Sequence, residues 1–299
     1  MKGANTNART TEQRNPRSRE LDLKSTREIL RIISREDTRV ARAVARELPQ
    51  IARAVDAIVR ALRRGGRLIY VGAGTSGRLA TLDAAECPPT FGVPPAVVQA
   101  VIAGGARALV RAVEGAEDSV SRGARDLAAR KITAHDVAVG LTASGSTPYV
   151  LGALAYARRL GAVTVGVTSN RRSPLARVAA ILIAPRVGPE VIAGSTRMKA
   201  GTAQKLVLNM LSTAAMVRLG RVYDNWMIDV ALTNQKLRQR GLRILAQVSG
   251  ASVSEAARAL RRAGHDLRVA LVMLKTGVDR AEALRRLKRA QGNLRRALV

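Results

Sequence analysis

The stretch from Leu68 to Pro89, LIYVGAGTSGRLATLDAAECPP, decides how the rest of this chain is interpreted. Its first four residues are apolar and predict a buried strand. A glycine-rich turn follows from Gly72 to Gly77. A helix, expected over Ser76–Ala85, then leads to Glu86, just before Cys87-Pro88-Pro89. This order of strand, glycine turn and helix is typical of an α/β unit.

The turn is suited to an anion, most often a phosphate. Backbone N–H groups at a helix start point outward, and the helix dipole favours negative charge there. Gly74 lets a ligand approach the backbone, and Thr75 and Ser76 add hydroxyl donors. A carboxylate a short helix away, Glu86, is more consistent with chemistry on a phosphorylated ligand than with affinity for it.

Two other interpretations of this turn stay open. Gly72, Gly74 and Gly77 match the G-x-G-x-x-G pattern of dinucleotide-binding folds. That pattern requires an acid about 20 positions further on to bind a ribose hydroxyl. The next apolar run, Val97–Ala103, instead ends in two glycines, which disfavours a dinucleotide. A plain tight turn without a ligand is the second alternative.

Short apolar runs alternate with helical segments from residue 67 onward. Runs of this length without polar alternation are typical of strands buried on both faces, as in a parallel sheet. With crossover helices they predict a doubly wound five-stranded α/β domain, whose ligand lies beyond the carboxyl ends of the strands. The predicted strands are Leu68–Val71, Val97–Ala103, Val137–Leu141, Val163–Val167 and Ile181–Ala184.

Helices are expected before and after this region of the sequence. Ser25 with Glu28, and Ser252 with Glu255, form capping-box patterns ahead of amphipathic helices. We therefore predict three parts: a disordered basic arm over 1–20, an α/β domain with N-terminal helices over 21–247, and a small helical domain over 248–299.

The composition limits the classes of function. The net charge is +29, but the basic residues are spread along the helices, and aromatic residues make up only 2%. We therefore predict no specific nucleic-acid partner, and expect the charge to steer small anions inward. No apolar run is long enough for a membrane span, and no secretory signal is visible. A single cysteine and two histidines predict a reducing cytoplasm and no zinc site.

Hydroxyl groups follow the third predicted strand, in a loop that opens a helix with Pro148. Because the carboxyl ends of parallel strands meet at one edge of a sheet, this loop is expected beside the glycine turn. Together they could surround a phosphate. The candidate ligands are Gly74, Thr75, Ser76, Ser144, Gly145, Ser146 and Thr147.

Acidic residues gather between these two loops. Glu114, Glu117 and Asp118 fall within five residues, on a helix predicted over Ala106–Leu127. Most acidic clusters are solvated surface faces. The position of this cluster, after the second strand of a phosphate-binding sheet, favours a functional interpretation.

A further candidate segment precedes an apolar helix predicted over Ala203–Leu219. Ser195, Arg197 and Lys199 lie at its start and suit an anionic ligand group, and Glu190 is included among the substrate ligands. An ordinary helix cap with two exposed bases is the alternative.

Four segments together resemble the N-acetylmuramic acid 6-phosphate etherases, a family with a sugar isomerase (SIS) domain. The likeness runs from about Asn15 to the C-terminus, and it is densest in Gly72–Leu79, Leu82–Pro89, Ala112–Ser119 and Gly194–Thr202. The resemblance implies an SIS-type fold, a homodimer, and no metal or organic cofactor.

The resemblance also implies the reaction. The family cleaves the D-lactyl ether at C3 of N-acetylmuramic acid 6-phosphate, giving N-acetylglucosamine 6-phosphate and D-lactate, in cell-wall sugar recycling. It assigns the catalytic roles to Glu86, as proton donor, and Glu117. The apolar neighbours of Glu86 favour a protonated acid, and the polar stretch around Glu117 favours an ionised base. Ser146 departs from the family, where this position is often Arg; Arg78 or Arg197 could compensate.

Two alternative functions stay open. A non-catalytic sugar-phosphate sensor needs the hydroxyl loops but no pair of carboxylates. An aldose–ketose isomerase would share the abstraction of the C2 proton but would release no lactate.

Overall fold

The structure is a computed structural model, and it describes residues 10–230, 232 and 235–299. The chain divides into two compact units. The first contains the described residues up to Ala85 together with Ala96–Ser212, and the second contains Glu86–Pro95 and Thr213–Val299. This division differs from the predicted boundary after residue 247.

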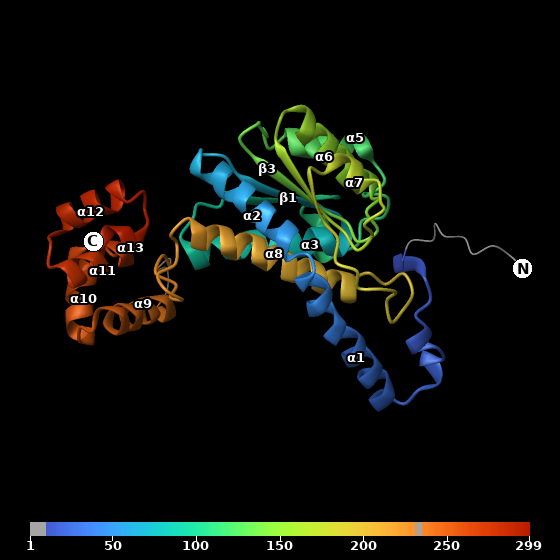
Figure 1. Cartoon of the computed structure of the whole chain (residues 1–299), viewed down its shortest axis with the longest axis horizontal. Coiled ribbons are helices and arrows are strands. Elements are labelled where there is room, and N and C mark those ends of the chain that lie inside the picture. Colours follow the sequence, from blue (N-terminus) through green and yellow to red (C-terminus); the bar gives the residue numbers. More distant parts are fainter. Residues whose placement is uncertain (1–9, 231, 233–234) are drawn as a thin grey trace, which may run out of the picture. The chain divides into compact units, whose positions relative to one another are not determined.

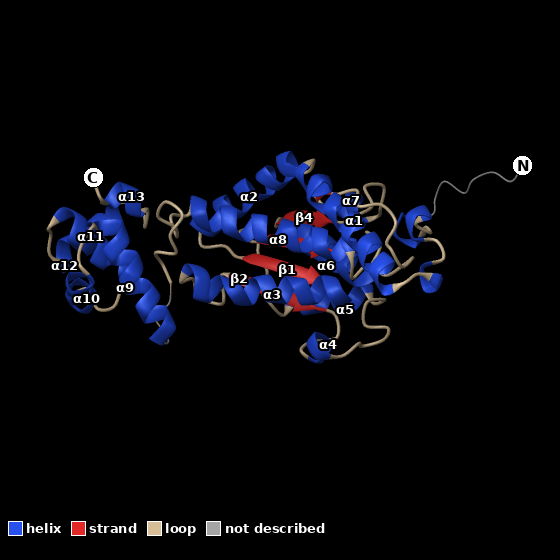
Figure 2. Cartoon of the chain, turned by 90° about the horizontal axis from the view of Figure 1, so that it is seen from below, coloured by secondary structure: helices blue, strands red, loops and turns tan. Residues whose placement is uncertain are grey.

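Within the described residues of the first unit, five strands form one parallel sheet in the order β2-β1-β3-β4-β5 (Figures 1 and 2). The doubly wound five-stranded parallel sheet is therefore confirmed. The strands begin and end within about two residues of the predicted runs: β1 Leu68–Gly72, β2 Val98–Ile102, β3 Val137–Leu141, β4 Val163–Val167 and β5 Ile181–Ile183.

Strand β1 shows why helices cover both faces of the sheet. Successive side chains of a strand point to opposite faces. Tyr70 points to one face, where its hydroxyl donates to Asp83 at 2.9 Å. Ile69 and Val71 point to the other, where they join a buried apolar core. Figure 1 shows α2 (Leu48–Arg63) and α3 (Gly74–Phe91) on one side of the sheet, and α5 (Val120–Ala128), α6 (Pro148–Arg159) and α7 (Leu175–Val178) on the other.

Two glycines let α5 and α6 approach each other closely. A Cβ on Gly123 would lie 1.9 Å from the carbonyl oxygen of Tyr149, and a Cβ on Gly152 would lie 2.1 Å from that of Val120. Any larger residue at either position would force the helices apart. The start of α6 is thus fixed against α5.

The predicted helix over Ala106–Leu127 is wrong. A single turn, α4 (Arg107–Val110), is followed by a loop that turns at Gly115, whose φ is +68°. The next helix, α5, begins only after Ser119, whose hydroxyl accepts the N–H of Arg122 at 3.2 Å. The acidic residues of this region therefore lie in a turn rather than on a helix.

Helix α3 also differs from the prediction, because it continues past Ala85 to Phe91 and contains Pro88 and Pro89. Each proline lacks the N–H that would reach the preceding turn. The chain nevertheless keeps its helical path, and the N–H of Gly92 donates to the carbonyl of Pro88 at 3.0 Å.

The N-terminal segment differs from the expected disordered arm over residues 10–20. Asn15 is 3% exposed, and its side-chain amide donates to Glu36 at 2.9 Å and to the carbonyl of Pro189 at 3.2 Å. The Ser18 hydroxyl donates to the carbonyl of Val191 at 2.7 Å. Residues 1–9 of the predicted arm lie outside the described residues. Three short 3-10 helices, η1 Thr10–Glu12, η2 Pro16–Ser18 and η3 Leu21–Leu23, lead to α1 Thr26–Ala45, which Ser25 caps as predicted.

The second unit packs its helices around a core of its own. Ile228 and Val230, which precede the helices, join this core, as do Ile244 and Leu245. They extend the unit to residues that the sequence assigned to the α/β part. Ser252 forms the predicted capping box. The helices are α9 Gln235–Ser249, α10 Val253–Arg262, α11 Leu267–Thr276, α12 Arg280–Arg289 and α13 Leu294–Ala297, and α8 Lys199–Arg218 spans the residues at which the two units divide.

Asp136 joins the amino ends of β1 and β3. Its carboxylate, 2% exposed, accepts the backbone N–H and the guanidinium of Arg67, and also the N–H of Thr133, all within 3.1 Å. Burial alone would raise the pKa of Asp136, but these hydrogen bonds and the charge of Arg67 outweigh it and hold that pKa below its usual value.

We expect Asp136→Asn to lower the free energy of unfolding by about 2 kcal/mol at pH 7, because Arg67 loses its charged partner. A carboxyl group with a depressed folded pKa stabilises the fold above its unfolded pKa, and that contribution is lost as the pH falls through the folded pKa. The difference between variant and parent should therefore shrink in acid. Urea unfolding at pH 7, and again well below the usual pKa of aspartate, measures both effects.

The control is Asp279→Asn, at an exposed helix N-cap where asparagine serves as well as aspartate. It should change little at either pH. An equal loss of unfolding free energy in both variants would contradict the stabilising role of the Asp136 carboxylate. So would a difference between Asp136→Asn and the parent that does not depend on pH.

Candidate active site

Two loops meet at the carboxyl edge of the sheet because β1 and β3 are parallel neighbours. Gly72, the last residue of β1, is paired with Leu141, the last residue of β3. The chain leaves β1 into the first turn of α3 and leaves β3 into the loop over 142–147. The structure thus brings together the two candidate anion loops.

The first turn of α3 is held close to the end of β1. A Cβ on Gly72 would lie 2.7 Å from the backbone nitrogen of Gly77, so the turn tolerates no side chain there. Gly74 has a φ of +51° and is exposed, Thr75 is half-buried, and Ser76 is buried. An 18-residue helix begins at this point, so its free N–H groups and its dipole favour an anion here.

The loop after β3 is a connected set of hydroxyl groups. Thr142 Oγ1 lies 2.8 Å from Thr147 Oγ1 and 3.3 Å from Ser144 Oγ, which lies 3.0 Å from Ser146 Oγ. Thr142 also accepts the N–H of Gly145 at 3.2 Å. Ser144, Ser146 and Thr147 are half-buried, so a ligand can reach them. Hydroxyl groups that bond to one another can rotate to donate to a phosphate.

The end of β4 supports this loop from behind. Ala143 O accepts the hydroxyl of Thr168 at 3.1 Å and the N–H of Ser169 at 3.0 Å. Gly145 has a φ of +74°, and a Cβ there would lie 2.1 Å from Ser173 Oγ. Glycine is therefore required at position 145 for both its conformation and its size.

The start of α8 adds a third segment next to α3. An added Cβ on Gly201 would lie 3.4 Å from Thr75 Cγ2, which is an ordinary van der Waals contact. Ser195 is half-buried and Arg197 is exposed. Of the cations predicted here, Arg197 is thus accessible to a ligand.

Two other residues of this segment have their charged groups engaged inside the protein. Glu190 is fully buried, and its carboxylate accepts the backbone N–H groups of Lys199 and Ala200 at 3.0 and 2.9 Å. Burial raises the pKa of Glu190, against the opposing effect of these two donors. Lys199 is 1% exposed, and its ammonium group donates to the buried Glu36 on α1. Both were predicted to contact substrate; in the structure they hold the start of α8.

Glu117 lies beside the hydroxyl loop through its main chain. Its carbonyl oxygen accepts the N–H of Tyr149 at 2.9 Å, in the first turn of α6, and α6 follows directly on the loop. Glu117 is exposed, and so are Glu114 and Asp118. The turn that carries Glu117 is therefore fixed next to the candidate phosphate loop.

Arg78 holds the chain that leads to this turn. Its guanidinium donates to the carbonyl oxygens of Ala108, Leu109 and Arg111 at 3.0, 3.2 and 3.2 Å. The sequence proposed Arg78 as a replacement phosphate ligand for the arginine that is absent at 146. Because the guanidinium is directed at three carbonyl groups, the structure favours a role in positioning the loop instead.

Glu86 lies on α3 in the part that belongs to the second unit, and it is exposed. Its expected enclosure by apolar side chains is not found in the single chain. Glu86 and Glu117 fall in different units, so the pairing of the two glutamates stays a prediction.

One turn before Glu86 the sequence reasoning missed a buried acid. Asp83, 7% exposed, accepts hydrogen bonds from the Tyr70 hydroxyl, from Asn209 at 3.2 Å and from Ser212 at 3.1 Å. Burial raises the pKa of Asp83, although these donors oppose the effect. Asp83 lies at helical spacing with the buried Ala80, Ala84 and Cys87, and this periodicity could have revealed it.

Two further observations concern the described residues. No three His, Cys, Asp or Glu side chains among them group as metal ligands would. None of the helices described is long and apolar enough to cross a membrane.

Comparison with protein families places this α/β domain in the SIS class. The model of the glucokinase regulatory protein N-terminal SIS domain matches residues 50–158, and the SIS domain model matches residues 118–214. A solved phosphoheptose isomerase from Neisseria gonorrhoeae covers 64% of this chain, with 98% of its own length, 17% identity and a TM-score of 0.51. That likeness concerns the fold alone.

Closer relatives define the family. The N-acetylmuramic acid 6-phosphate etherase of Enterobacter sp. (strain 638) is 54% identical over 271 residues, 91% of each chain. That of Yersinia pestis (strain Pestoides F) is 54% identical over 268 residues, 90% of this chain and 91% of its own. The chain belongs to the N-acetylmuramic acid 6-phosphate etherase family.

We expect Arg78→Ala to loosen the loop before Glu117 without unfolding the sheet. Losing hydrogen bonds worth about 1.4 kcal/mol corresponds to roughly tenfold faster local opening. Hydrogen exchange of amides in residues 107–118 should rise by about that factor, while exchange in β1 and β3 should not change. The matched control is Arg243→Ala, an exposed arginine of α9. Unchanged exchange in residues 107–118 would show that the hydrogen bonds of Arg78 do not hold this loop in place.

Proposed function

We propose that this protein cleaves the D-lactyl ether of N-acetylmuramic acid 6-phosphate, giving N-acetylglucosamine 6-phosphate and D-lactate. The observation that carries the proposal is the hydrogen bond from the Tyr149 N–H to Glu117 O. This hydrogen bond holds the turn that carries the Glu117 carboxylate next to the hydroxyl loop. The groups that bind the phosphate and the group that reacts with the sugar carbon would then lie on neighbouring segments. The family to which the chain belongs supports this substrate.

The hydroxyl loop and the first turn of α3 would bind the phosphate of the sugar. Ser144, Ser146, Thr147, Thr75 and Ser76 supply hydroxyl donors, and the helix start supplies N–H groups and a favourable dipole. Arg197 is an accessible cation near this site. Lys199 and Glu190 act indirectly, by fixing the start of α8.

The reaction uses the open-chain aldehyde form of the sugar. The C2 hydrogen is acidified by the neighbouring carbonyl, so the Glu117 carboxylate can remove it as a general base. The C3–O bond then breaks, and the leaving oxygen takes a proton from Glu86 and departs as the hydroxyl of D-lactate. Water adds at C3 of the unsaturated aldehyde and a proton returns to C2, which completes the hydrolysis. No step requires a metal or an organic cofactor.

The proposal includes the setting of the enzyme. We infer a homodimer that acts in the cytoplasm in the recycling of cell-wall sugars. The family resemblance supports the dimer and the pathway, and a sequence with a single cysteine, Cys87, suits a reducing compartment. Sedimentation of the purified chain would test the dimer.

A sugar-phosphate sensor is the second candidate, because residues 50–158 match the SIS domain of a regulatory protein. The two are separated by incubating the protein with N-acetylmuramic acid 6-phosphate and measuring D-lactate. Tight binding of the sugar phosphate without release of lactate would favour the sensor.

We expect Glu86→Gln and Glu117→Gln each to lower turnover by at least about 100-fold, the low end for acid–base catalysis. Both side chains are exposed, so the fold should persist, as circular dichroism would verify. Glu114→Gln is the matched control, because Glu114 is exposed in the same turn as Glu117. Parent-like release of D-lactate by either variant would remove that residue from the mechanism.

We expect Ser144→Ala to raise KM for the phosphorylated sugar roughly 10- to 100-fold, since a hydrogen bond to a charged group contributes about 1.5–3 kcal/mol. The change in kcat should be smaller. Binding of the unphosphorylated sugar should not respond to the substitution. Ser254→Ala, an exposed serine of α10, serves as control. An equal effect on both sugars would show that Ser144 does not contact the phosphate.

A further inference from the structure

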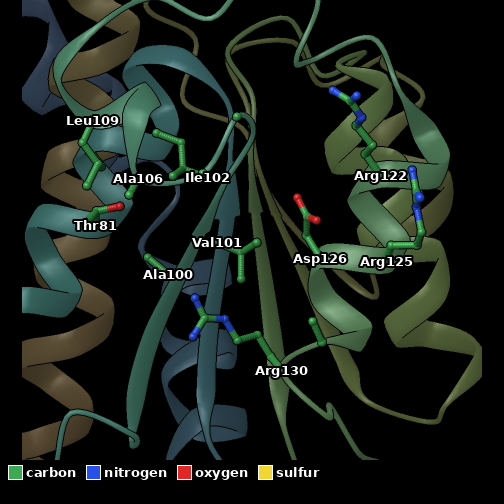
Figure 3. A pocket seen from close by; sticks show the side chains of 13 residues that line it. Thr81, Ala100, Val101, Ile102, Ala106, Leu109, Arg122, Arg125, Asp126 and Arg130 are labelled. Carbon is green, nitrogen blue, oxygen red and sulfur yellow. The ribbon is translucent and has the colours of Figure 1, made fainter.

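A groove of about 960 Å³ runs along strand β2, and none of the candidate active-site residues lines it. Figure 3 shows one wall made by α5, with Arg122, Arg125 and Asp126. Thr81 and Leu109 lie on the opposite side, and Ala100 of β2 lies between the walls. The groove is therefore a site separate from the two hydroxyl loops.

The floor of the groove is the open edge of the sheet. Among the described strands, β2 pairs with β1 only. The N–H of Leu68 donates to Val97 O, and the N–H of Ala103 donates to Gly72 O. Backbone groups of a parallel strand face its neighbour at every second residue, so those of Ala100 and Ile102 face the groove. The carbonyl oxygen of Ile102 accepts the N–H of Gly105. The N–H of Ile102 and the N–H and carbonyl groups of Ala100 remain available to pair with another chain.

The α5 wall carries unpaired positive charge. Arg122, Arg125 and Arg130 are exposed, and no side-chain hydrogen bond or ion pair engages their guanidinium groups within the part of the chain that the structure describes. The acid on this wall, Asp126, accepts the hydroxyl of Tyr149 at 2.7 Å. The groove thus offers three free cations along one side of an unpaired strand.

The spacing of these cations fits an extended chain. Arg122 and Arg130 are eight residues apart along α5 and its C-terminal turn, a rise of about 12 Å. In a strand, side chains at positions i, i+2 and i+4 point the same way and span about 13 Å. Five residues of an added strand, with a carboxylate at every second position, would therefore span the length of α5 and its C-terminal turn over which the three arginines are distributed.

We propose that this groove binds an acidic, extended segment of a partner protein, which adds to β2 as a further strand and directs a carboxylate at every second position toward α5. Main-chain hydrogen bonds to Ala100 and Ile102 supply the pairing, and the arginines supply the selectivity for acidic sequences. The interaction is independent of the proposed etherase activity.

The test uses the full chain and a fluorescent peptide of about nine residues with alternating glutamate and threonine, at physiological salt. We expect saturable binding by fluorescence anisotropy. Hydrogen exchange of the Ala100 and Ile102 amides should slow when the peptide binds. A second peptide keeps every glutamate but replaces the central threonines by proline, which cannot donate to a sheet. It should bind at least about tenfold more weakly.

The variant Arg122→Glu/Arg125→Glu should weaken binding by at least about tenfold. The matched control is Arg258→Glu/Arg261→Glu, which makes the same charge change at the same spacing on exposed arginines of α10. It should bind the peptide like the parent. Thermal unfolding of both variants verifies that each remains folded.

Several outcomes would overturn the proposal. Equal binding of the two peptides would mean that charge alone attracts them, as would equal weakening in the two variants. Absence of binding would indicate instead that the arginines prevent other strands from pairing with β2. A single-stranded oligonucleotide that binds more tightly than the peptide, and depends on Arg122 and Arg125, would assign the groove to nucleic acid.

Discussion

The parallel pairing of β1 with β3 is the constraint on which the candidate active site depends. Parallel strands end at the same edge, so the turn after Gly72 and the loop after Leu141 meet although about 70 residues separate them in the sequence. Each loop alone is an ordinary helix start. Side by side, the two loops direct N–H and hydroxyl donors to the same edge of the sheet. The α5–α6 contact, made possible by Gly123 and Gly152, then brings the turn of Glu117 to the same edge.

Buried carboxylates fix the geometry of this edge. Glu190 holds the first N–H groups of α8, Glu36 pairs with Lys199 and Asn15, and Asp83 links β1, α3 and α8. A buried charge is costly unless several donors surround it, and each of these acids has at least two. These three carboxylates therefore connect the elements that carry the candidate site.

The sheet could be predicted from the sequence because strands that are buried on both faces consist of short apolar runs. The runs around Leu68 and Val137 contain no polar residue, and both were found within a residue of their predicted bounds. The loops were less predictable. A helical pattern over Ala106–Leu127 hid the turn at Gly115, since tertiary contacts from Arg78 and Tyr149 stabilise that turn and local propensity does not reveal them.

The site shows the same limit. The position of Ser144, Ser146 and Thr147 at the carboxyl edge could be predicted because they follow a buried strand, whereas their contact with a phosphate stays a prediction. Lys199 could not be distinguished from Arg197 by residue type, and its partner, Glu36, lies 163 residues away in the sequence. A charged residue near a loop is equally consistent with binding a ligand and with supporting the fold. Only the burial of its partner separates the two roles.

The difference in exposure among the acids has a mechanistic consequence. Glu36, Asp83 and Glu190 are buried and engaged, whereas Glu86 and Glu117 are exposed in the single chain. A general acid works at neutral pH when its surroundings favour the protonated form, and removal of water strengthens its interaction with the leaving group. The single chain does not enclose Glu86. On the proposed mechanism that enclosure must come from the bound sugar or from a second copy of the chain, and in the second case the chemistry would depend on the proposed homodimer.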